Sequence, residues 1–196
     1  MIGRRLVLAS ASTARAAILE HAGFEVTRVP AAVDEAEVKE AFRREGRPAA
    51  DCAVALATAK AERISRRHRG AFVIGADQML VCGDVWFDKP PDLDHARAQL
   101  IALRGHTHEL VSAVVVFRDG EDLWHYLDRA RLTMRPFSDA VLDEYLAAAG
   151  ESVLGSVGAY QLEGLGVHLF SRIEGDYFSI LGLPLLPLLD FLRAQR

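Results

Sequence analysis

Along the first part of the chain, short apolar runs alternate with segments whose apolar residues recur at helical spacing. Residues 6–9 form a continuous apolar run and residues 24–29 alternate apolar and polar side chains, so both segments predict strands. Between them, Ser12 is suited to cap a helix and Gly23 is suited to end it. The predicted order is strand, tight turn, helix and second strand.

The most strongly apolar segments lie near the middle of the chain. Residues 53–64 place apolar side chains along one side of a predicted helix. Residues 72–76 predict a strand that is buried on both faces and delivers Asp77 at its C-terminal end. Residues 79–87 predict a hairpin around a Gly-Asp turn, whereas the mixed, charged residues 30–48 predict no clear element.

The second half of the chain continues the alternation of strands and helices. Residues 107–117 predict a long strand, followed by a hairpin turn at Asp119 and Gly120 and a return strand toward Met134. The remaining predicted elements are a loop at residues 88–91, a helix from there to Gly105, a helix from Ser138 to Gly150, a glycine-rich loop at residues 155–166, a strand near residues 167–173 and a last helix opened by Pro184. Because two hairpins interrupt the alternation, we predict an α/β fold with a mixed, twisted β-sheet flanked by helices.

The length fits one domain or two closely joined lobes, and we expect a single domain over residues 1–196. The chain is 51% apolar and 26% charged, a balance typical of globular proteins that bury their own core. The formal net charge of −4 leaves no broad basic surface for a nucleic-acid polymer. No stretch approaches the roughly 20 apolar residues of a membrane helix, so we expect no membrane partner and a cytoplasmic protein.

The turn between the first strand and the first helix holds small hydroxylated residues and an arginine. Backbone N–H groups and the positive end of the helix dipole favour an anion beside Ser10 and Ser12, and Arg15 can bind two phosphate oxygens at once. An N-capping serine is also ordinary, and no glycine-rich phosphate motif is present. The residues alone leave a phosphate site and a simple helix cap open.

Asp77 is the most unusual carboxylate in the sequence. A carboxylate among apolar residues loses hydration and needs a cation, a metal ion or a proton. Asp77 could therefore hold a metal ion or deprotonate water, but a turn aspartate that accepts backbone hydrogen bonds is an equal alternative. Lys60 and Lys89, taken singly, are more simply explained as exposed side chains.

Several further polar residues have a functional and a plainer interpretation. Asp34 and Glu35 are candidate metal ligands, and Glu163 lies among glycines that permit the close approach of a ligand. The simpler interpretation of each of these residues is an exposed charge on the protein surface. His106 and His108 share one face of a predicted strand, but the sequence places no further ligand at the spacing that a metal site needs.

Taken together, these segments resemble the Maf family of nucleotide pyrophosphatases over nearly the whole chain. The motifs that carry the resemblance occur in the family's order: residues 8–12 with Arg15, residues 33–35, Leu56-Ala57 with Lys60-Ala61, residues 74–77, Lys89-Pro90, residues 103–108, residues 158–160, residues 174–177 and residues 182–184. The resemblance implies a Maf/ITPase-like fold with two lobes around a central cleft, a nucleoside triphosphate substrate and a homodimer. It also implies hydrolysis to a nucleoside monophosphate and pyrophosphate, which clears modified nucleotides from the pool.

The same resemblance implies roles for individual residues. Asp77 is the expected proton acceptor, and Glu35 with Asp77 is expected to hold a divalent cation, Mg²⁺ or Mn²⁺. A triphosphate carries about four negative charges, which cations must neutralise before water can attack. The residues implied to bind the phosphates are Ser10, Ser12, Arg15, Lys60 and Lys89.

Three positions bear on the choice of nucleobase. Gln78 and Glu163 resemble the 7-methyl-GTP subgroup of the family, in which a carboxylate could accept hydrogen bonds from guanine. Ala14 departs from that subgroup, which has an aromatic residue at this position, and the commonest family pattern has Pro and Arg where this chain has Thr13 and Ala14. A 7-methyl-GTP-like substrate is therefore one expectation among modified nucleotides.

Two other functions stay open on the sequence alone. One is a non-catalytic nucleotide-binding regulator linked to cell division, and the other is a phosphomonoesterase that releases inorganic phosphate. A protein that only binds nucleotides has little need of a base such as Asp77, which favours the pyrophosphatase.

Overall fold

The first elements of the chain form as the pattern of apolar residues predicts. In the computed structural model, which describes residues 2–195, β1 spans Arg5–Leu8, α1 spans Thr13–His21 and β2 spans Glu25–Arg28. Ser12 is the N-cap of α1, and its Oγ accepts a hydrogen bond from the backbone N–H of Arg15 at 3.3 Å. The predicted strand, capped helix and second strand are therefore confirmed.

A helix lies in the charged segment for which the sequence predicts no element. This helix, α2, spans Glu35–Arg44, and the carboxylate of Asp34 caps it by accepting a backbone hydrogen bond from its first turn. Phe42 is the one buried residue among its ten, so α2 lacks the apolar stripe that would reveal it. The next helix, α3, spans Ala49–Ser65 and begins four residues before its predicted start at residue 53.

Asp77 lies inside a strand rather than at its end. β3 spans Phe72–Cys82 without a break, because its last part pairs antiparallel with β4 (Val85–Phe87) in the predicted hairpin. The parallel partner β1, however, pairs with β3 only as far as Leu8 and Ile74. The predicted strand end is therefore wrong, but Asp77 still lies beyond the carboxyl end of the neighbouring β1, where α/β sheets bind ligands.

The remaining elements agree with the prediction in type more closely than in bounds. They are α4 (Leu93–Leu103), β5 (Thr107–Arg118), β6 (Glu121–Met134), α5 (Asp139–Ala149), the 3₁₀ helices η1 (Gly150–Gly155), η2 (Val157–Ala159) and η3 (Leu165–Leu169), β7 (Phe170–Glu174), α6 (Tyr177–Ile180) and α7 (Leu185–Ala194). The strand predicted near residues 167–173 starts at Phe170, because η3 occupies the residues before it. No pattern predicts α6, which is only four residues long.

Within residues 2–195, seven strands form one mixed sheet. The strand order is β2-β1-β3-β5-β6-β7, and β4 pairs with β3 off this path. β1 runs parallel to β2 and β3, whereas β6 and β7 are antiparallel. The predicted α/β class with a mixed sheet and flanking helices is confirmed.

The chain divides into two compact units. Unit 1 comprises Met1–Gln78, Ser112–Asp128 and Tyr177–Arg196, and unit 2 comprises Met79–Val111 and Arg129–Asp176. Three of the four boundaries fall within β3, β5 and β6, and the fourth lies between β7 and α6. The central cleft and the single domain over residues 1–196 stay predictions.

None of the helices within residues 2–195 combines the length and the apolar character needed to cross a bilayer.

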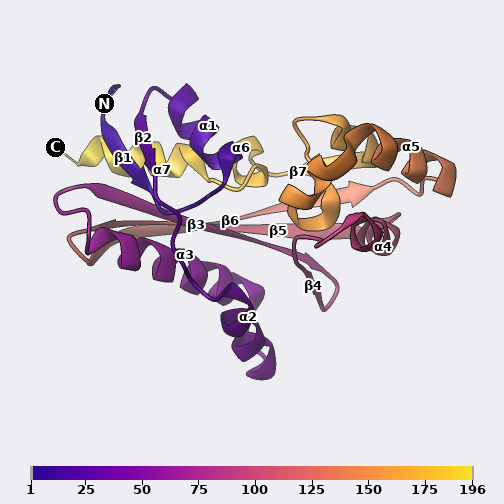
Figure 1. Cartoon of the computed structure of the whole chain (residues 1–196), viewed down its shortest axis with the longest axis horizontal. Helices are drawn as coiled ribbons and strands as arrows, with labels where there is room; N and C mark the ends of the chain where they lie inside the picture. Colours follow the sequence, from indigo (N-terminus) through magenta and orange to yellow (C-terminus); the bar gives the residue numbers. More distant parts are fainter. Residues whose placement is uncertain (1, 196) are drawn as a thin grey trace. The chain divides into compact units, whose positions relative to one another are not determined.

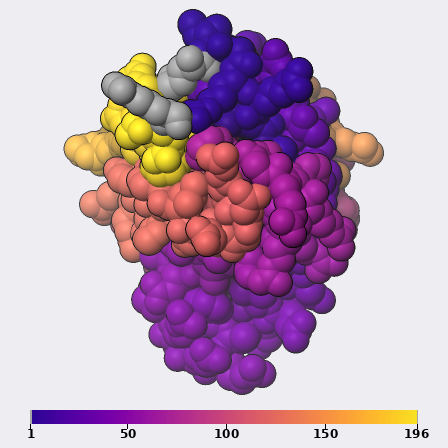
Figure 2. Space-filling model, turned by 90° about the vertical axis from the view of Figure 1, so that its left-hand side faces the viewer, coloured from indigo at the N-terminus to yellow at the C-terminus, as the bar shows by residue number. Residues whose placement is uncertain are grey.

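In unit 1, the end of α3 packs against the turn between β5 and β6. The backbone N–H of Gly120 donates to Ser65 Oγ at 2.9 Å, and that of Gly70 donates to the Asp119 carboxylate at 2.8 Å. Figure 2 shows the region of this turn directly above the purple region of α3. Asp119 and Gly120 have φ of 54° and 88°, which confirms the predicted hairpin turn.

Helices cover both faces of the sheet in unit 1. Figure 1 shows α1 and α7 on one side of β1 and β3, and α3 on the other. Ile74 and Ala76 belong to the core cluster formed with α1 and α7. Because side chains alternate along a strand, Gly75 and Asp77 face α3.

Gly75 lets α3 approach β3 unusually closely. A Cβ on Gly75 would lie 2.1 Å from the backbone oxygen of Ala57 and 2.8 Å from the Cβ of Ala61. Both of these residues are on α3, on either side of Lys60 in sequence. The missing side chain at Gly75 therefore allows Lys60 to reach Asp77, two residues further along β3.

Gly75→Ala is expected to lower the free energy of unfolding by about 2 kcal/mol or more, because a backbone carbonyl would have to move. Denaturant titration measures the change. Gly155→Ala is a matched control, since a Cβ there would meet no atom within 4 Å, and it should stay within about 0.5 kcal/mol of the parent. Equal stability of the two variants would contradict the close packing of α3 on β3.

Candidate active site

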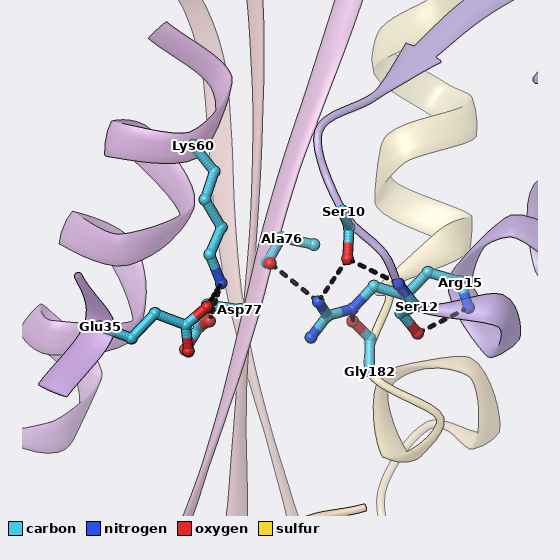
Figure 3. Close-up of polar contacts among 8 residues, drawn as sticks. All are labelled: Ser10, Ser12, Arg15, Glu35, Lys60, Ala76, Asp77 and Gly182. Atoms are coloured by element: carbon cyan, nitrogen blue, oxygen red, sulfur yellow. Dashed lines mark hydrogen bonds and ion pairs between the residues drawn. The ribbon is translucent and has the colours of Figure 1, made fainter. Parts of the chain in front are cut away.

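Lys60 links two carboxylates that come from different elements. Its Nζ lies 2.6 Å from Oδ1 of Asp77 and 2.6 Å from Oε1 of Glu35 (Figure 3). Lys60 and Asp77 are 7% and 5% exposed, whereas Glu35 is half-buried. Three charged residues that are far apart in the sequence thus meet where α3, β3 and the start of α2 come together. The expectation that Lys60 is an exposed side chain is therefore wrong.

The pairing keeps Glu35 ionised. Partial burial alone would raise the pKa of Glu35, but the hydrogen bond and the charge of Lys60 outweigh it. Lys39 and Arg15 add smaller contributions of the same sign, and the pKa lies below its ordinary value. Glu35 is therefore a carboxylate at neutral pH, held next to the carboxyl group of Asp77.

The second oxygen of Asp77 has no hydrogen-bond donor. Oδ2 is buried, and no group within residues 2–195 donates to it. Buried polar atoms nearly always have a partner, so this oxygen is suited to accept a proton from a bound water or to contact a cation brought by a ligand. The alternative of a turn aspartate is wrong, because Asp77 lies inside β3.

The guanidinium of Arg15 is fixed by acceptors from three segments. Nε donates to the backbone oxygen of Gly182 at 2.8 Å, and Nη1 donates to the backbone oxygen of Ala76 at 2.9 Å and to Ser10 Oγ at 3.3 Å. Within residues 2–195, no acceptor engages Nη2. Its two N–H groups therefore remain for an anion.

Arg15 lies in the same electrostatic field as the Lys60 group. Burial lowers the pKa of Arg15, and the charges of Asp77 and Glu35 partly restore it. Ala76, whose carbonyl Arg15 binds, directly precedes Asp77 (Figure 3). Unit 1 therefore joins Lys60 directly to Asp77 and holds Arg15 at the neighbouring Ala76, whereas a phosphate site shared by all three stays a prediction.

Ser10 and Ser12 organise the turn before α1. Ser10 Oγ accepts from the backbone N–H of Ser12 at 3.2 Å, and Ser12 Oγ accepts from that of Arg15 at 3.3 Å. Two of the backbone donors expected to bind phosphate are thus already occupied. Each hydroxyl still has its own O–H to donate to a ligand. Ala14 follows in the first turn of α1, half-buried and without a polar side chain.

Gln78 uses its amide donors within the protein. Nε2 lies 2.9 Å from Ser112 Oγ and 3.0 Å from the backbone oxygens of both Ser179 and Ile180. Because an amide nitrogen carries only two hydrogens, these acceptors consume its donor capacity. Gln78 can offer a nucleobase only its Oε1.

The other candidate residues belong to unit 2. Lys89 and Glu163 are exposed there, and their roles in binding phosphate and base stay predictions. His108 is buried, its Nε2 lies 2.8 Å from the hydroxyl of Tyr160, and burial lowers its pKa to about 4. His106 is exposed and precedes β5, so the predicted shared strand face of the two histidines is wrong.

The carboxylates fit a divalent cation that is held together with a phosphate. Asp77 and Glu35 approach one ammonium ion, and Asp77 Oδ2 is unpartnered. Mg²⁺ usually binds through one or two carboxylates, with substrate phosphates and waters completing its shell. Within residues 2–195, no group of three or more His, Cys, Asp or Glu side chains could hold a metal ion by itself. The chain can therefore supply part of a coordination shell.

Sequence reasoning gives no role to two glycines that shape the site. Gly75 permits the contact between α3 and β3, and Gly182 carries the carbonyl that accepts from Arg15. Gly182 has φ of +95°, and a Cβ there would lie 3.3 Å from Arg15 Nε. Only its place in the Gly-Leu-Pro motif at residues 182–184 could have drawn attention to it.

Comparisons with known proteins agree with this arrangement. A family model described as Maf-like protein matches residues 5–195. A nucleoside triphosphate pyrophosphatase of Granulibacter bethesdensis is 58% identical over 98% of both chains, and one of Paramagnetospirillum magneticum is 61% identical over 96% of this chain and 97% of its own. A 7-methyl-GTP pyrophosphatase of Mesorhizobium japonicum is 49% identical over 97% of this chain and 96% of its own.

Lys60→Met is expected to raise the pKa of Glu35 relative to the parent, because burial remains while the hydrogen bond and the charge of Lys60 are lost. Titration of the carboxyl carbons by NMR measures the shift. Lys39→Met removes only a smaller contribution and should move this pKa much less. An unchanged pKa of Glu35 in Lys60→Met would contradict the ion pair.

The same variant should lose stability in a pH-dependent way. Breaking the buried pair with Asp77 should cost about 3 kcal/mol at pH 7. Because the pKa of Glu35 is lower in the folded state, the ion pair of Glu35 stabilises the folded protein above the ordinary pKa of this residue. That stabilisation is lost as the pH falls through the lowered pKa. Denaturant titrations should therefore show a deficit at pH 7 that shrinks as the pH falls below the ordinary pKa of Glu35, and a deficit independent of pH would contradict the pairing.

Proposed function

Because the chain belongs to the Maf-like protein family, we propose that it is a nucleoside triphosphate pyrophosphatase, which converts its substrate to a nucleoside monophosphate and pyrophosphate. The observation that carries the proposal is the carboxylate of Asp77: Lys60 holds Oδ1, while the buried Oδ2 has no partner within residues 2–195. A base beside cationic side chains is what the hydrolysis of a phosphate anhydride requires.

Asp77 is the proton acceptor in the proposed reaction. Its Oδ2 takes a proton from a water molecule as the water oxygen forms a bond to the α-phosphorus. The bond from the α-phosphorus to the bridging oxygen breaks, and pyrophosphate leaves with the electron pair. The proton on Asp77 then passes to solvent, which restores the carboxylate for the next cycle.

The phosphates are bound by groups that the fold leaves available. Arg15 offers both N–H groups of Nη2, and Ser10 and Ser12 offer their O–H groups. Lys60 places a buried ammonium beside the base, and Lys89 adds a second ammonium in this proposal. Fixed donors of this kind stabilise charge that develops on the phosphate oxygens and on the leaving pyrophosphate.

Glu35 and Asp77 would hold a divalent cation, Mg²⁺ or Mn²⁺, jointly with the substrate. When bound, such a cation neutralises phosphate charge and stabilises the departing pyrophosphate. Two features of the chain support the assignment: the pKa of Glu35 is held low, and Asp77 Oδ2 is unpartnered.

The proposed substrates are modified nucleoside triphosphates, with a 7-methyl-GTP-like nucleotide as one candidate. Relatives named nucleoside triphosphate pyrophosphatase and relatives named 7-methyl-GTP pyrophosphatase both match nearly the whole chain. Ala14 and Glu163 are the proposed specificity residues, and a small residue at Ala14 leaves room for a modified base. We also propose that the protein is a homodimer in the cytoplasm.

Product analysis separates this function from its alternatives. Purified protein is incubated with Mg²⁺ or Mn²⁺ and a panel of common and methylated triphosphates, and the products are identified by ion-exchange chromatography. Monophosphate with pyrophosphate is the expected result. Inorganic phosphate would instead indicate a phosphomonoesterase, and binding without turnover would indicate the nucleotide-binding regulator.

Asp77→Asn is expected to lower kcat by about 10²- to 10⁴-fold, the usual contribution of a general base. Nucleotide affinity should change little, because asparagine keeps the shape of the side chain. Asp190→Asn is a matched control, since Asp190 is an exposed residue of unit 1 whose one ion pair within residues 2–195 is with Arg193. Turnover in Asp77→Asn near the level of this control would contradict the assignment of the base.

A further inference from the structure

We propose that unit 1 carries a second anion site, outside the proposed catalytic site, which binds phosphate-bearing small anions such as inorganic phosphate and pyrophosphate. The site is an open cavity of about 560 Å³ between residues 32–34 and the C-terminal end of α3. In Figure 1, the chain that leads into α2 crosses α3. Three arginines line the cavity: Arg63, Arg66 and Arg67.

The end of α3 is strongly basic in a protein that is acidic as a whole. Residues 63–69 contain four of the 23 lysines and arginines, although the formal net charge of the chain is −4. Two acidic residues also line the cavity, but each has a partner. The Asp34 carboxylate accepts from the backbone N–H of Glu37 at 3.0 Å, and Glu62 pairs with Arg66. Three arginines against two carboxylates leave the lining with an excess of positive charge, which favours an anion.

Two of the arginines have their guanidinium groups available for a ligand. Within residues 2–195, neither Arg63 nor Arg67 takes part in a side-chain hydrogen bond or an ion pair. A guanidinium presents its N–H groups as a planar fork that binds two oxygens of one phosphate. Two such groups beside a concave surface can hold one anion from two sides. An anion with several oxygens and more than one negative charge, such as a phosphate, suits this pair best.

The dipole of α3 does not account for this arrangement. The negative end of a helix dipole favours a basic residue in the last turn, such as Arg63, but its effect falls off beyond that turn and gives no reason for Arg67. The last carbonyls, which would repel an anion, have backbone donors. The N–H of Arg67 donates to the carbonyl of Ile64 at 3.0 Å, and that of His68 donates to the carbonyl of Ser65 at 3.2 Å.

Both walls of the cavity are held by contacts to the rest of unit 1. Ser65 Oγ accepts from the backbone N–H of Gly120 at 2.9 Å, which anchors the end of α3 on the turn between β5 and β6. On the other wall, the backbone N–H of Val29 donates to a carbonyl at the end of β1 at 2.9 Å, and Asp34 caps α2. Only the arginine side chains therefore need to be ordered when an anion binds, which lowers the entropic cost.

The cavity and the proposed catalytic groups use different stretches of α3. Lys60 meets Asp77, whereas Ser65, further along the helix, meets the turn that contacts the chain just before β3. α3 therefore runs back toward the start of β3, and Arg63 and Arg67 lie on that side of Lys60. The inference goes beyond the proposed function and does not depend on it.

The first experiment titrates ¹⁵N-labelled protein with inorganic pyrophosphate at pH 7 and constant ionic strength, and follows the backbone amide signals by NMR. The signals of residues 32–34 and 63–67 should shift along a saturable curve with a Kd of about 1 mM. Parallel titrations with inorganic phosphate and with a nucleoside monophosphate compare the possible sources of the anion. Saturable binding of any of the three supports the inference, and the tightest of them identifies the preferred ligand.

Variants test charge and shape separately. Arg63→Gln combined with Arg67→Gln should raise the Kd at least about tenfold, because charge-assisted hydrogen bonds to the anion are lost. Ala59→Leu narrows the cavity, keeps every charge and should raise the Kd about threefold or more. Arg5→Gln combined with Arg193→Gln removes the same charge from exposed positions of unit 1 outside this cavity and should leave the Kd unchanged. Thermal unfolding checks that each variant is folded at the titration temperature.

The possible results have distinct meanings. Shifts that chloride reproduces at equal ionic strength would reflect only general screening of charge and would overturn the inference. An equal Kd in the parent and in the variant without Arg63 and Arg67 would also overturn it. Saturable shifts that this variant weakens and the control variant does not would support it. The signals of Ser12 and Arg15 report separately on the proposed catalytic site, so their failure to shift would count against the phosphate-binding role proposed for Arg15 and leave the second site unaffected.

Discussion

One buried ammonium between two carboxylates organises the candidate site. Lys60 Nζ lies 2.6 Å from oxygens of both Asp77 and Glu35, and it is the ion-pair partner of a carboxyl group that is only 5% exposed. The pairing needs α3 close to β3, which the missing side chain of Gly75 permits. It leaves one oxygen of Asp77 unpartnered within residues 2–195, and that oxygen is the atom that a hydrolytic mechanism can use.

Successive side chains of β3 point to opposite faces of the sheet, and the two faces have different proposed roles. The face that carries Asp77 meets α3, and Lys60 on that helix is the counter-ion of Asp77. The opposite face carries Gln78, and the backbone oxygen of Ala76 holds Arg15, whose second contact is the carbonyl of Gly182. One strand thereby carries the proposed proton acceptor and holds the proposed phosphate-binding Arg15, which is more than 50 residues away in the sequence.

The sequence predicts the parts of unit 1 in which apolar pattern and local chemistry agree. β1, α1 with its Ser12 cap and the turn at Asp119 follow from such signals. α2 lacks an apolar stripe, and the position of Asp77 inside β3 depends on pairing with β4, so neither can be inferred locally. The proximity of Lys60 and Asp77 agrees with what the motif resemblance implies, and the inclusion of Arg15 in the same site stays a prediction. The acceptors that hold the Gln78 amide, and the glycines that allow the close contacts, depend on tertiary packing that no short segment encodes.

The central claim is that Asp77 activates water for attack on the α-phosphorus of a nucleoside triphosphate. Its most direct test is hydrolysis in ¹⁸O-labelled water, with mass spectrometry of both products after a single turnover. The account predicts that the label appears in the nucleoside monophosphate and that pyrophosphate stays unlabelled. Label in the pyrophosphate would mean attack at the β-phosphorus and would contradict the account.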